Sequence, residues 1–541
     1  MATSITVTSL SFTWPDGSPV FEDLDVAFGP GRTGLVGVNG SGKSTLLKLI
    51  AGELAPADGT VRVAGEVGYL PQNVTLDTIL RVDEALGIAD KRAALHAIEA
   101  GDVSEARFET VGDDWDVEER ALATLGELGL GDIGLDRTIG EVSGGESVLL
   151  RLAALLLRRP DVLLLDEPTN NLDLYARRRL YAAVQSWPGV LVVVSHDREL
   201  LDLVDQIADL RSGGITWYGG NYSAYEEALE TEQEAAERMV RVAEADFRRQ
   251  KRELTDAQVK LARRRRYAQK MYDTKREPRA VMKLKSRAAQ VSAGKHRIMH
   301  EEKLAEARER LDEAAEAVRD DDEIRVDLPF TAVPPGRTVL TLQDLGLRYG
   351  ARIKGGLELR GPERVALIGR NGAGKTTLLR TIAGELPPES GEVTAHVPLR
   401  FLPQRLDVLD GERTVAENVA RFAPGATNNR IRARLARFLF RGGRADQQAS
   451  TLSGGERFRA ALAALMLAEP APQLLMLDEP TNNLDMSSVR QLTTALESYE
   501  GSLIVASHDL PFLESVGITR WLLLEEGELK EITSEAVGFP A

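Results

Sequence analysis

Glycines, a lysine and a hydroxyl residue occur twice in this chain with a spacing that suits a nucleotide phosphate. The first copy reads GVNGSGKS over residues 37–44, and the second reads GRNGAGKT over residues 369–376. Glycines let backbone N–H groups curl around a phosphate chain, while the lysine reaches the outer phosphates and the hydroxyl binds Mg²⁺. We therefore predict two nucleotide-binding loops with these contact residues: Gly37, Asn39, Gly40, Gly42, Lys43, Ser44 and Thr45, and Gly369, Asn371, Gly372, Gly374, Lys375, Thr376 and Thr377.

Carboxylates and histidines follow apolar runs in both halves of the chain. Asp166-Glu167 and Asp478-Glu479 each end such a run, and His196 and His508 each stand in a Ser-His-Asp triplet. An aspartate there would hold Mg²⁺ through water, and the glutamate would orient or deprotonate the attacking water. We predict that the histidines sense the γ-phosphate, with a strand-capping histidine as the alternative. A hydrolase triad is excluded, since side chains adjacent on a strand tip cannot form a relay.

The two sets of motifs have the same order and nearly the same spacing. The pairs Lys43/Lys375 and Gln72/Gln404 are both 332 residues apart, and the pairs Asp166/Asp478 and His196/His508 are both 312 residues apart. A core of constant spacing therefore occurs twice. The first copy has 22 additional residues before its Ser-Gly-Gly-Glu motif.

Short apolar runs must form the strands that position these side chains. We expect strands at residues 33–36, 162–165, 190–194, 365–368, 474–477 and 503–506. Continuous apolar runs are typical of parallel strands covered on both faces, and their alternation with helical segments predicts an α/β class.

Composition limits the possible environments and chemistries. The 541 residues suffice for two or three domains, with 43% apolar residues and no cysteine. The absence of cysteine excludes disulfides, iron–sulfur sites and thiol nucleophiles. Neither an apolar run of membrane-spanning length nor a secretory signal is evident, so we expect a cytoplasmic protein.

A basic segment interrupts an otherwise acidic chain. The net charge is −16, yet residues 248–297 carry 18 Lys and Arg against 4 Asp and Glu. Such asymmetry, with interleaved aromatic residues, predicts contact with RNA. The alternative is a solvated coiled coil. The predicted RNA-binding residues are Arg263, Arg264, Arg265, Arg266, Lys270, Lys275, Arg276, Arg279, Lys283, Lys285 and Arg287.

Apolar residues at alternating three- and four-residue spacing predict that this segment is an antiparallel helical hairpin. Its first helix would bury Ala236, Val240, Ala243, Phe247, Leu254, Ala257, Leu261 and Ala268, and its second would bury Leu284, Ala288, Val291, Leu304, Leu311 and Val318. The predicted domains are 1–222, 223–325 as the linker, and 326–541.

The Ser-Gly-Gly-Glu motifs resemble the signature of ATP-binding cassette (ABC) ATPases, and the order of all the motifs resembles that family. The resemblance implies two ATP molecules between head-to-tail cassettes of one chain, with Gln72 and Gln404 reaching Mg²⁺ and the γ-phosphate. Segments 170–173 and 482–485 resemble D-loops at the cassette interface. Trp14 and Tyr349 would stack on adenine, unless they are ordinary surface or core aromatics. The signature residues implied are Ser143, Gly144 and Gly145, and Ser453, Gly454 and Gly455.

The helical linker between the cassettes makes the whole chain resemble the ABC-F family. This resemblance implies an α/β fold with two P-loop ABC-type domains joined by a long antiparallel α-helical hairpin. It also implies a monomer that hydrolyses ATP at two composite sites, with no membrane subunit and no DNA partner. The implied partner is the 70S ribosome at its exit site, with the basic linker reaching rRNA and P-site tRNA at the peptidyl-transferase centre.

Two roles stay open within this resemblance: a general translation factor, and protection of ribosomes against antibiotics. Residues 289–295 resemble linkers of the resistance type and favour protection. The alternatives from other classes are an ATPase subunit of a transporter and a DNA-repair ATPase. The 22 additional residues lie in an acidic region, which indicates either an arm or an enlarged helical subdomain.

Overall fold

The structure is a computed structural model, and it describes residues 3–72, 79–142, 144–170, 172–211, 213–273, 298–315, 328, 330–348, 352–353, 356–482 and 484–533. Its contacts cluster into two compact units. One unit comprises residues 1–222 together with 322–541, and the other comprises residues 223–321. The domain limits at 325 and 326 stay a prediction, because residues 316–327 lie outside the described part.

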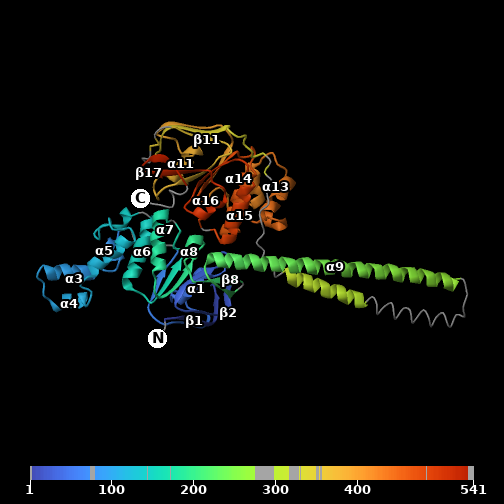
Figure 1. The fold of residues 1–541 in the computed structure, drawn as a ribbon, viewed down its shortest axis with the longest axis horizontal. Coiled ribbons are helices and arrows are strands. Elements are labelled where there is room, and N and C mark those ends of the chain that lie inside the picture. The colour runs from blue at the N-terminus through green and yellow to red at the C-terminus, as the bar shows by residue number, and fades with distance from the viewer. Residues whose placement is uncertain are drawn as a thin grey trace. The chain divides into compact units, whose positions relative to one another are not determined.

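The first cassette contains a three-stranded antiparallel sheet of order β2-β1-β4 and a six-stranded sheet of order β5-β6-β7-β3-β8-β9 (Figure 1). Its strands are β1 (Ile5–Thr13), β2 (Pro19–Phe28), β3 (Gly31–Val36), β4 (Asp58–Val63), β5 (Val67–Leu70), β6 (Val162–Asp166), β7 (Val190–Val194), β8 (Gln206–Arg211) and β9 (Gly214–Gly219). Its helices are α1 (Lys43–Ile50), α2 (Val82–Ala85), α3 (Ala89–Glu99), α4 (Glu105–Val111), α5 (Val117–Glu127), α6 (Gly144–Arg158), α7 (Leu174–Gln185) and α8 (Arg198–Leu201), with the 3-10 turn η1 (Ile139–Glu141).

The second cassette repeats this plan, with sheets of order β11-β10-β13 and β14-β15-β16-β12-β17-β18. Its strands are β10 (Thr338–Gly346), β11 (Gly356–Arg360), β12 (Arg364–Ile368), β13 (Ser390–Ala395), β14 (Leu399–Leu402), β15 (Leu474–Asp478), β16 (Ser502–Ala506), β17 (Arg520–Glu525) and β18 (Glu528–Ile532). Its helices are α11 (Lys375–Ile382), α12 (Val415–Phe422), α13 (Asn428–Leu435), α14 (Gly454–Met466), α15 (Met486–Glu497) and α16 (Leu510–Ser515), with 3-10 turns at Ala436–Phe438, Gly442–Asp446 and Ala449–Thr451.

The strands predicted from apolar runs are confirmed, as is the α/β class. Every residue of β6, β7, β15 and β16 is buried, as expected for central parallel strands with both faces covered. In each large sheet the strand that leads into the phosphate loop pairs with the strand that precedes the histidine. That strand in turn pairs with the one ending in aspartate. The ends of three parallel strands thus bring the predicted chemistry to one sheet edge.

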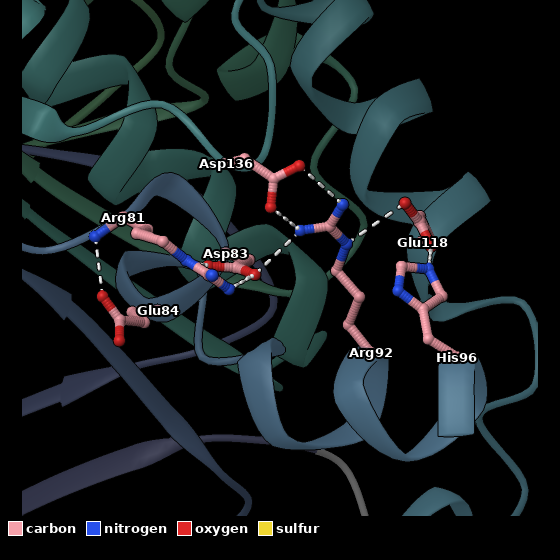
Figure 2. A network of polar contacts seen from close by, with 7 residues as sticks. All are labelled: Arg81, Asp83, Glu84, Arg92, His96, Glu118 and Asp136. Atoms are coloured by element: carbon pink, nitrogen blue, oxygen red, sulfur yellow. Dashed lines mark hydrogen bonds and ion pairs between the residues drawn. The ribbon is translucent and has the colours of Figure 1, made fainter. Parts of the chain in front are cut away.

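The additional residues of the first cassette belong to a helical subdomain that includes α3, α4 and α5. Several of its acidic residues form ion pairs within the subdomain, as Figure 2 shows around Arg92. The Arg92 guanidinium lies 2.9 Å from Asp83, 2.6 Å from Asp136 and 3.2 Å from Glu118. Asp114 pairs with Lys91 and Arg120. These ion pairs join α3 and α5 to the loops beside them, and the choice between an arm and an enlarged helical subdomain stays open.

The linker begins with α9 (Tyr222–Asp273), a single helix of 52 residues (Figure 1). At 1.5 Å per residue it is about 78 Å long. Residues 298–315 form the described part of the returning helix, and Arg310 on it lies 3.2 Å from Asp246 on α9. The fold class predicted from the sequence is thereby confirmed.

The predicted seam residues of α9 from Ala236 to Leu261 are partly buried, as are Leu304 and Leu311 on the returning helix. Ala307 and Ala314 are buried as well, although the prediction had left them out. Several predicted residues lie outside the described part: Leu284, Ala288, Val291 and Val318 of the seam, the side chain of Ala268, the side chains of Arg264 and Arg265, and Lys275, Arg276, Arg279, Lys283, Lys285 and Arg287. Among the described residues, no helix is both long and apolar enough to span a membrane.

The contacts of Arg92 predict its role in stability. Asp83 is fully buried, so Arg92→Met should leave a buried carboxylate with Arg81 as its remaining ion-pair partner and destabilise the subdomain by about 3 kcal/mol. Hydrogen exchange followed by mass spectrometry should show faster exchange in α3 and α5. Arg107→Met is the matched control, because its partner Asp102 is exposed. Equal exchange in the two variants would contradict the prediction.

Candidate nucleotide-binding sites

The two phosphate loops join a buried strand to the first turn of a helix. Gly42 and Gly374 stand at the N-caps of α1 and α11 with φ of +101° and +104°. A Cβ atom on Gly42 would lie 2.8 Å from the Phe21 ring, so both space and backbone conformation require glycine there. The free N–H groups of each helix start, together with the helix dipole, make a site for phosphate.

The lysine of each loop is buried and turned onto backbone carbonyls. Lys43 Nζ donates to Gly37 O at 2.8 Å, and Lys375 Nζ donates to Gly369 O at 2.7 Å. Burial lowers the pKa of both lysines, while nearby carboxylates oppose this shift. A phosphate oxygen is a charged acceptor and binds an ammonium more strongly than a carbonyl does. The loops therefore present cations suited to phosphate.

The Mg²⁺ positions predicted from the sequence contain a hydroxyl beside a buried carboxylate. Ser44 Oγ donates to Asp166 at 3.0 Å. Burial raises the pKa of Asp478, and the hydroxyl of Thr376 opposes this shift. Neither carboxylate oxygen of Asp478 has a well-formed hydrogen bond among the described residues. Such oxygen donors fit Mg²⁺, which keeps several waters and binds phosphate as well. The described residues include no cluster of three or more acidic, histidine or cysteine side chains that could hold a metal ion.

The predicted catalytic glutamates sit in a strained conformation against the histidines. Glu167 and Glu479 have φ of +49° and +46°, a region that non-glycine residues seldom occupy except at functional sites. His196 Nε2 lies 3.2 Å from Glu167 Oε1, and His508 Nε2 lies 3.3 Å from Glu479 Oε1. Burial raises the pKa of both glutamates, that of Glu479 to about 7. Burial also lowers the pKa of both histidines, so each pair is held close to neutral.

One cavity brings residues of both cassettes together. Its volume is about 500 Å³, and Gly144 and Gly145 of the first cassette line it opposite the phosphate loop of the second. The second cassette contributes Arg370, Asn371, Gly372, Gly374, Lys375, Thr376, Thr377, Gln404, Asp478, Glu479, Asn482 and His508. Two signature glycines of the first cassette thus share one cavity with the phosphate loop of the second.

The D-loop aspartates bind across the cassette interface. Asp173 caps α7 with one carboxylate oxygen and accepts the Asn371 amide with the other at 3.1 Å. Asp485 caps α15 in the same way and accepts the Asn39 amide at 3.0 Å. Burial acts to raise the pKa of Asp485, but the amide hydrogen bonds lower it to about 2. The Asp485 carboxylate therefore stays charged.

The remaining predicted contacts are only partly described. Ser453 caps α14 in a capping box with Glu456, and Gly454 and Gly455 begin that helix. Gln72 and Gln404 are exposed, each two residues after the end of β5 or β14. Trp14 is 37% exposed and makes a T-shaped contact with Phe12, and its stacking on adenine stays a prediction. Ser143, Tyr349, Asn171 and Asn483 lie outside the described residues.

Sequence reasoning missed two polar side chains beside these sites. Tyr69 donates to Asp166 at 3.4 Å, whereas the residue 332 positions later is Phe401. Arg177 is buried in α7 and reaches the backbone of the second cassette, whereas the residue 312 positions later is Val489. Aligning the two halves by their motif offsets would have marked both positions as unequal.

The raised pKa of Glu479 predicts how stability responds to pH without Mg²⁺ and nucleotide. The folded protein keeps a proton that the unfolded chain releases above pH 4.5, so this contribution falls as pH rises from 4.5 to about 7. Glutamine keeps the site neutral. At pH 8, the free energy of unfolding of Glu479→Gln should therefore exceed that of the wild type by on the order of 3 kcal/mol, and its melting temperature should be higher. At pH 5 the two proteins should melt at similar temperatures.

Thermal unfolding at both pH values is the measurement. Glu358→Gln is the control, because hydrogen bonds from Arg360 and Thr338 lower the pKa of Glu358 from 4.5, so its effect on stability should be nearly the same at pH 5 and pH 8. A melting advantage of Glu479→Gln that is the same at pH 5 and pH 8 would refute the proposed protonation.

Comparisons with known proteins agree with this geometry. The family described as "ABC transporter" matches residues 21–170 and 356–482. "Probable ATP-binding protein YheS" of Escherichia coli K12 is 32% identical over 92% of this chain and 75% of that protein. "Tylosin resistance ATP-binding protein TlrC" of Streptomyces fradiae is 34% identical over 91% of this chain and 92% of that protein.

Solved structures show the same fold. "RNase-L Inhibitor" matches with a TM-score of 0.57 at 20% identity, over 96% of this chain and 90% of that one. A chain of "Model of ribosome-bound archaeal Pelota and ABCE1" matches with a TM-score of 0.52 at 20% identity, over 97% and 78%. The chain therefore belongs to the ATP-binding cassette proteins, and its pair of cassettes joined by a helical linker makes it a member of the ABC-F family.

Proposed function

We propose that this protein is a cytoplasmic ribosome-binding ATPase that protects ribosomes against antibiotics. The observation that carries the proposal is the basic helical linker between two cassettes with full sets of catalytic motifs. Arg263, Arg266 and Lys270 are exposed on the last turns of α9, where RNA phosphates would match their charge. Tyr267 between them is 68% exposed and available to stack on an unpaired base.

ATP would be hydrolysed at two composite sites. Lys43 and Lys375 would bind the outer phosphates, and the signature glycines of the opposite cassette would close over them. Mg²⁺, held by Ser44 or Thr376 with Gln72 or Gln404, would neutralise phosphate charge. Glu167 and Glu479 would take the proton of the attacking water, while His196 and His508 would orient the γ-phosphate. The raised pKa values of the glutamates suit a general base near neutral pH.

The linker would extend from the exit site toward rRNA and P-site tRNA at the peptidyl-transferase centre. ATP binding would close the cassettes on the ribosome, and hydrolysis would release them. A relative named for tylosin resistance, matched over nine-tenths of both chains, favours protection over a general role in translation. The general translation factor is the second candidate, because other relatives carry no resistance in their names.

Ribosome binding can be tested by co-sedimentation. Glu167→Gln/Glu479→Gln should trap the ATP-loaded protein and pellet with 70S ribosomes when ATP is present, and the pelleted fraction should fall steeply between 50 and 200 mM salt. Lys43→Ala/Lys375→Ala should stay in the supernatant. If the trapped protein holds ATP yet never pellets, the ribosome is not the partner.

The linker's part in that binding has a matched control within α9. Arg263→Glu/Arg266→Glu in the trapped background should weaken pelleting at least tenfold, because charge reversal replaces attraction to phosphate by repulsion. Arg238→Glu/Arg241→Glu has the same spacing in the acidic half of the helix and should pellet normally. Equal loss in both pairs would remove the argument for a basic RNA-binding end.

Protection is tested by cell-free translation with tylosin. The wild-type protein should restore synthesis, and Glu167→Gln/Glu479→Gln should not, because it cannot leave the ribosome. Stimulation of translation without drug, combined with no change in the inhibitory tylosin concentration, would favour the general translation factor.

A further inference from the structure

Arg177 is a buried arginine at the interface of the two cassettes. It lies one turn into α7, directly after the D-loop, and is 8% exposed. Its Nε donates to Leu172 O in the D-loop at 3.2 Å. One terminal nitrogen donates to Asp197 at 3.1 Å and reaches His508 O of the second cassette at 3.5 Å. One side chain thus touches a D-loop, the residue after one histidine and the backbone of the other histidine.

The local environment holds this guanidinium in place. The side chain of Asp197 is 6% exposed, and its carboxylate also accepts the Tyr181 hydroxyl at 2.7 Å and caps α8 through the Leu200 amide. A buried ion pair that is fully hydrogen-bonded is rigid, and breaking it by removing one partner leaves an uncompensated charge. These contacts hold the Arg177 guanidinium beside the backbone carbonyl of His508 in the second cassette.

The corresponding place in the other half lacks this group. Offset by 312 residues, Arg177 becomes Val489 and Tyr181 becomes Thr493. A second contact across the interface also occurs in one half only. The Arg370 guanidinium lies 5.3 Å above the Tyr175 ring, whereas the equivalent residues of the other half are Val38 and Ser487. Both additional cations therefore serve the half of the interface that contains the second cassette's phosphate loop.

The residue that Arg177 reaches belongs to the catalytic set. His508 Nε2 lies 2.9 Å from Lys375 Nζ and 3.3 Å from Glu479, and all three residues line the shared cavity. A donor on the carbonyl of His508 fixes the main chain from which that imidazole projects. The positive charge also acts on Glu479, where it opposes the rise in pKa caused by burial.

We propose that Arg177 is a positioning residue for ATP hydrolysis at the second cassette's site only, acting across the interface through the backbone of His508. The two ATP sites of this protein are consequently not equivalent, although their motif residues match. The inference rests on the ATP hydrolysis proposed above and needs no ribosome. The site assembled from Lys43, Glu167 and His196 has Val489 in this place and works without such a group.

The test measures first-turnover ATP cleavage by rapid chemical quench in two single-site proteins. Glu167→Gln leaves the second cassette's site able to cleave, and Glu479→Gln leaves the first. Arg177→Val, which copies the residue of the other half, should slow cleavage in the Glu167→Gln protein roughly fivefold or more. The ATP concentration for half-maximal rate should change less than the rate itself, and cleavage in the Glu479→Gln protein should change less than about twofold.

Two further variants separate positioning from folding. Arg177→Lys keeps the buried charge beside Asp197 but cannot reach three partners at once. It should therefore melt near the parent protein, yet cleavage at the second cassette's site should still be slowed selectively. Tyr181→Phe removes a hydrogen bond from the same Asp197 without reaching the second cassette, and it should leave the ratio of the two rates unchanged. An equal loss at both sites, or a loss at neither, would overturn the proposal. The rates of the two parent proteins report separately whether the sites hydrolyse ATP at all.

Discussion

The interaction on which the paired cassettes depend is the double use of one carboxylate in each D-loop. One oxygen of Asp173 or Asp485 caps the helix of its own cassette, and the other accepts an amide from the phosphate loop of the opposite cassette. A carboxylate that accepts two backbone amides links the helix after the D-loop of one cassette to the phosphate loop of the other. These D-loop contacts set the position of one cassette against the other. Gly144 and Gly145 of the first cassette therefore line a cavity with the phosphate loop of the second.

The sites themselves work against stability. They bury lysines, carboxylates and histidines, and they hold two glutamates in a conformation with positive φ. Surrounding strands that are apolar on both faces supply the packing that sustains this strain. The same burial that is unfavourable for the empty site tunes it for chemistry, since it brings a glutamate pKa to about 7 and keeps the histidines neutral. A nucleotide with Mg²⁺ would balance the charges buried in each site. The rules that charged residues stay exposed and that non-glycine residues avoid positive φ therefore fail at the functional site.

The sequence was sufficient for the fold because its signals are strong and repeated. Apolar runs gave the central strands, the constant offsets gave the two cassettes, and alternating three- and four-residue spacing gave the seam of α9. Contacts that depend on the close approach of distant segments were not readable in the same way. Tyr69 was one more aromatic in a strand, and Arg177 was one of three consecutive arginines on a helix. Nothing local distinguishes Arg177 from Arg178 or Arg179; only burial and its place at the interface do. The helical subdomain was ambiguous for a related reason, because the sequence does not show which acidic residues pair with Arg92 and Arg120.

A chain of contacts leads from the ATP sites to the start of the linker helix. Arg177 pairs with Asp197, which follows His196, and the next residue, Arg198, lies 5.9 Å above the ring of Tyr222, the first residue of α9. Tyr222 is 3% exposed, so the helix starts from a packed position and not from a free loop. Arg177 therefore joins the histidine loop of the first cassette, from which α9 continues along the chain, to the backbone of the histidine in the second cassette. The unequal interface thus involves the cassette that leads into the linker, whereas the equivalent position in the second cassette is Val489.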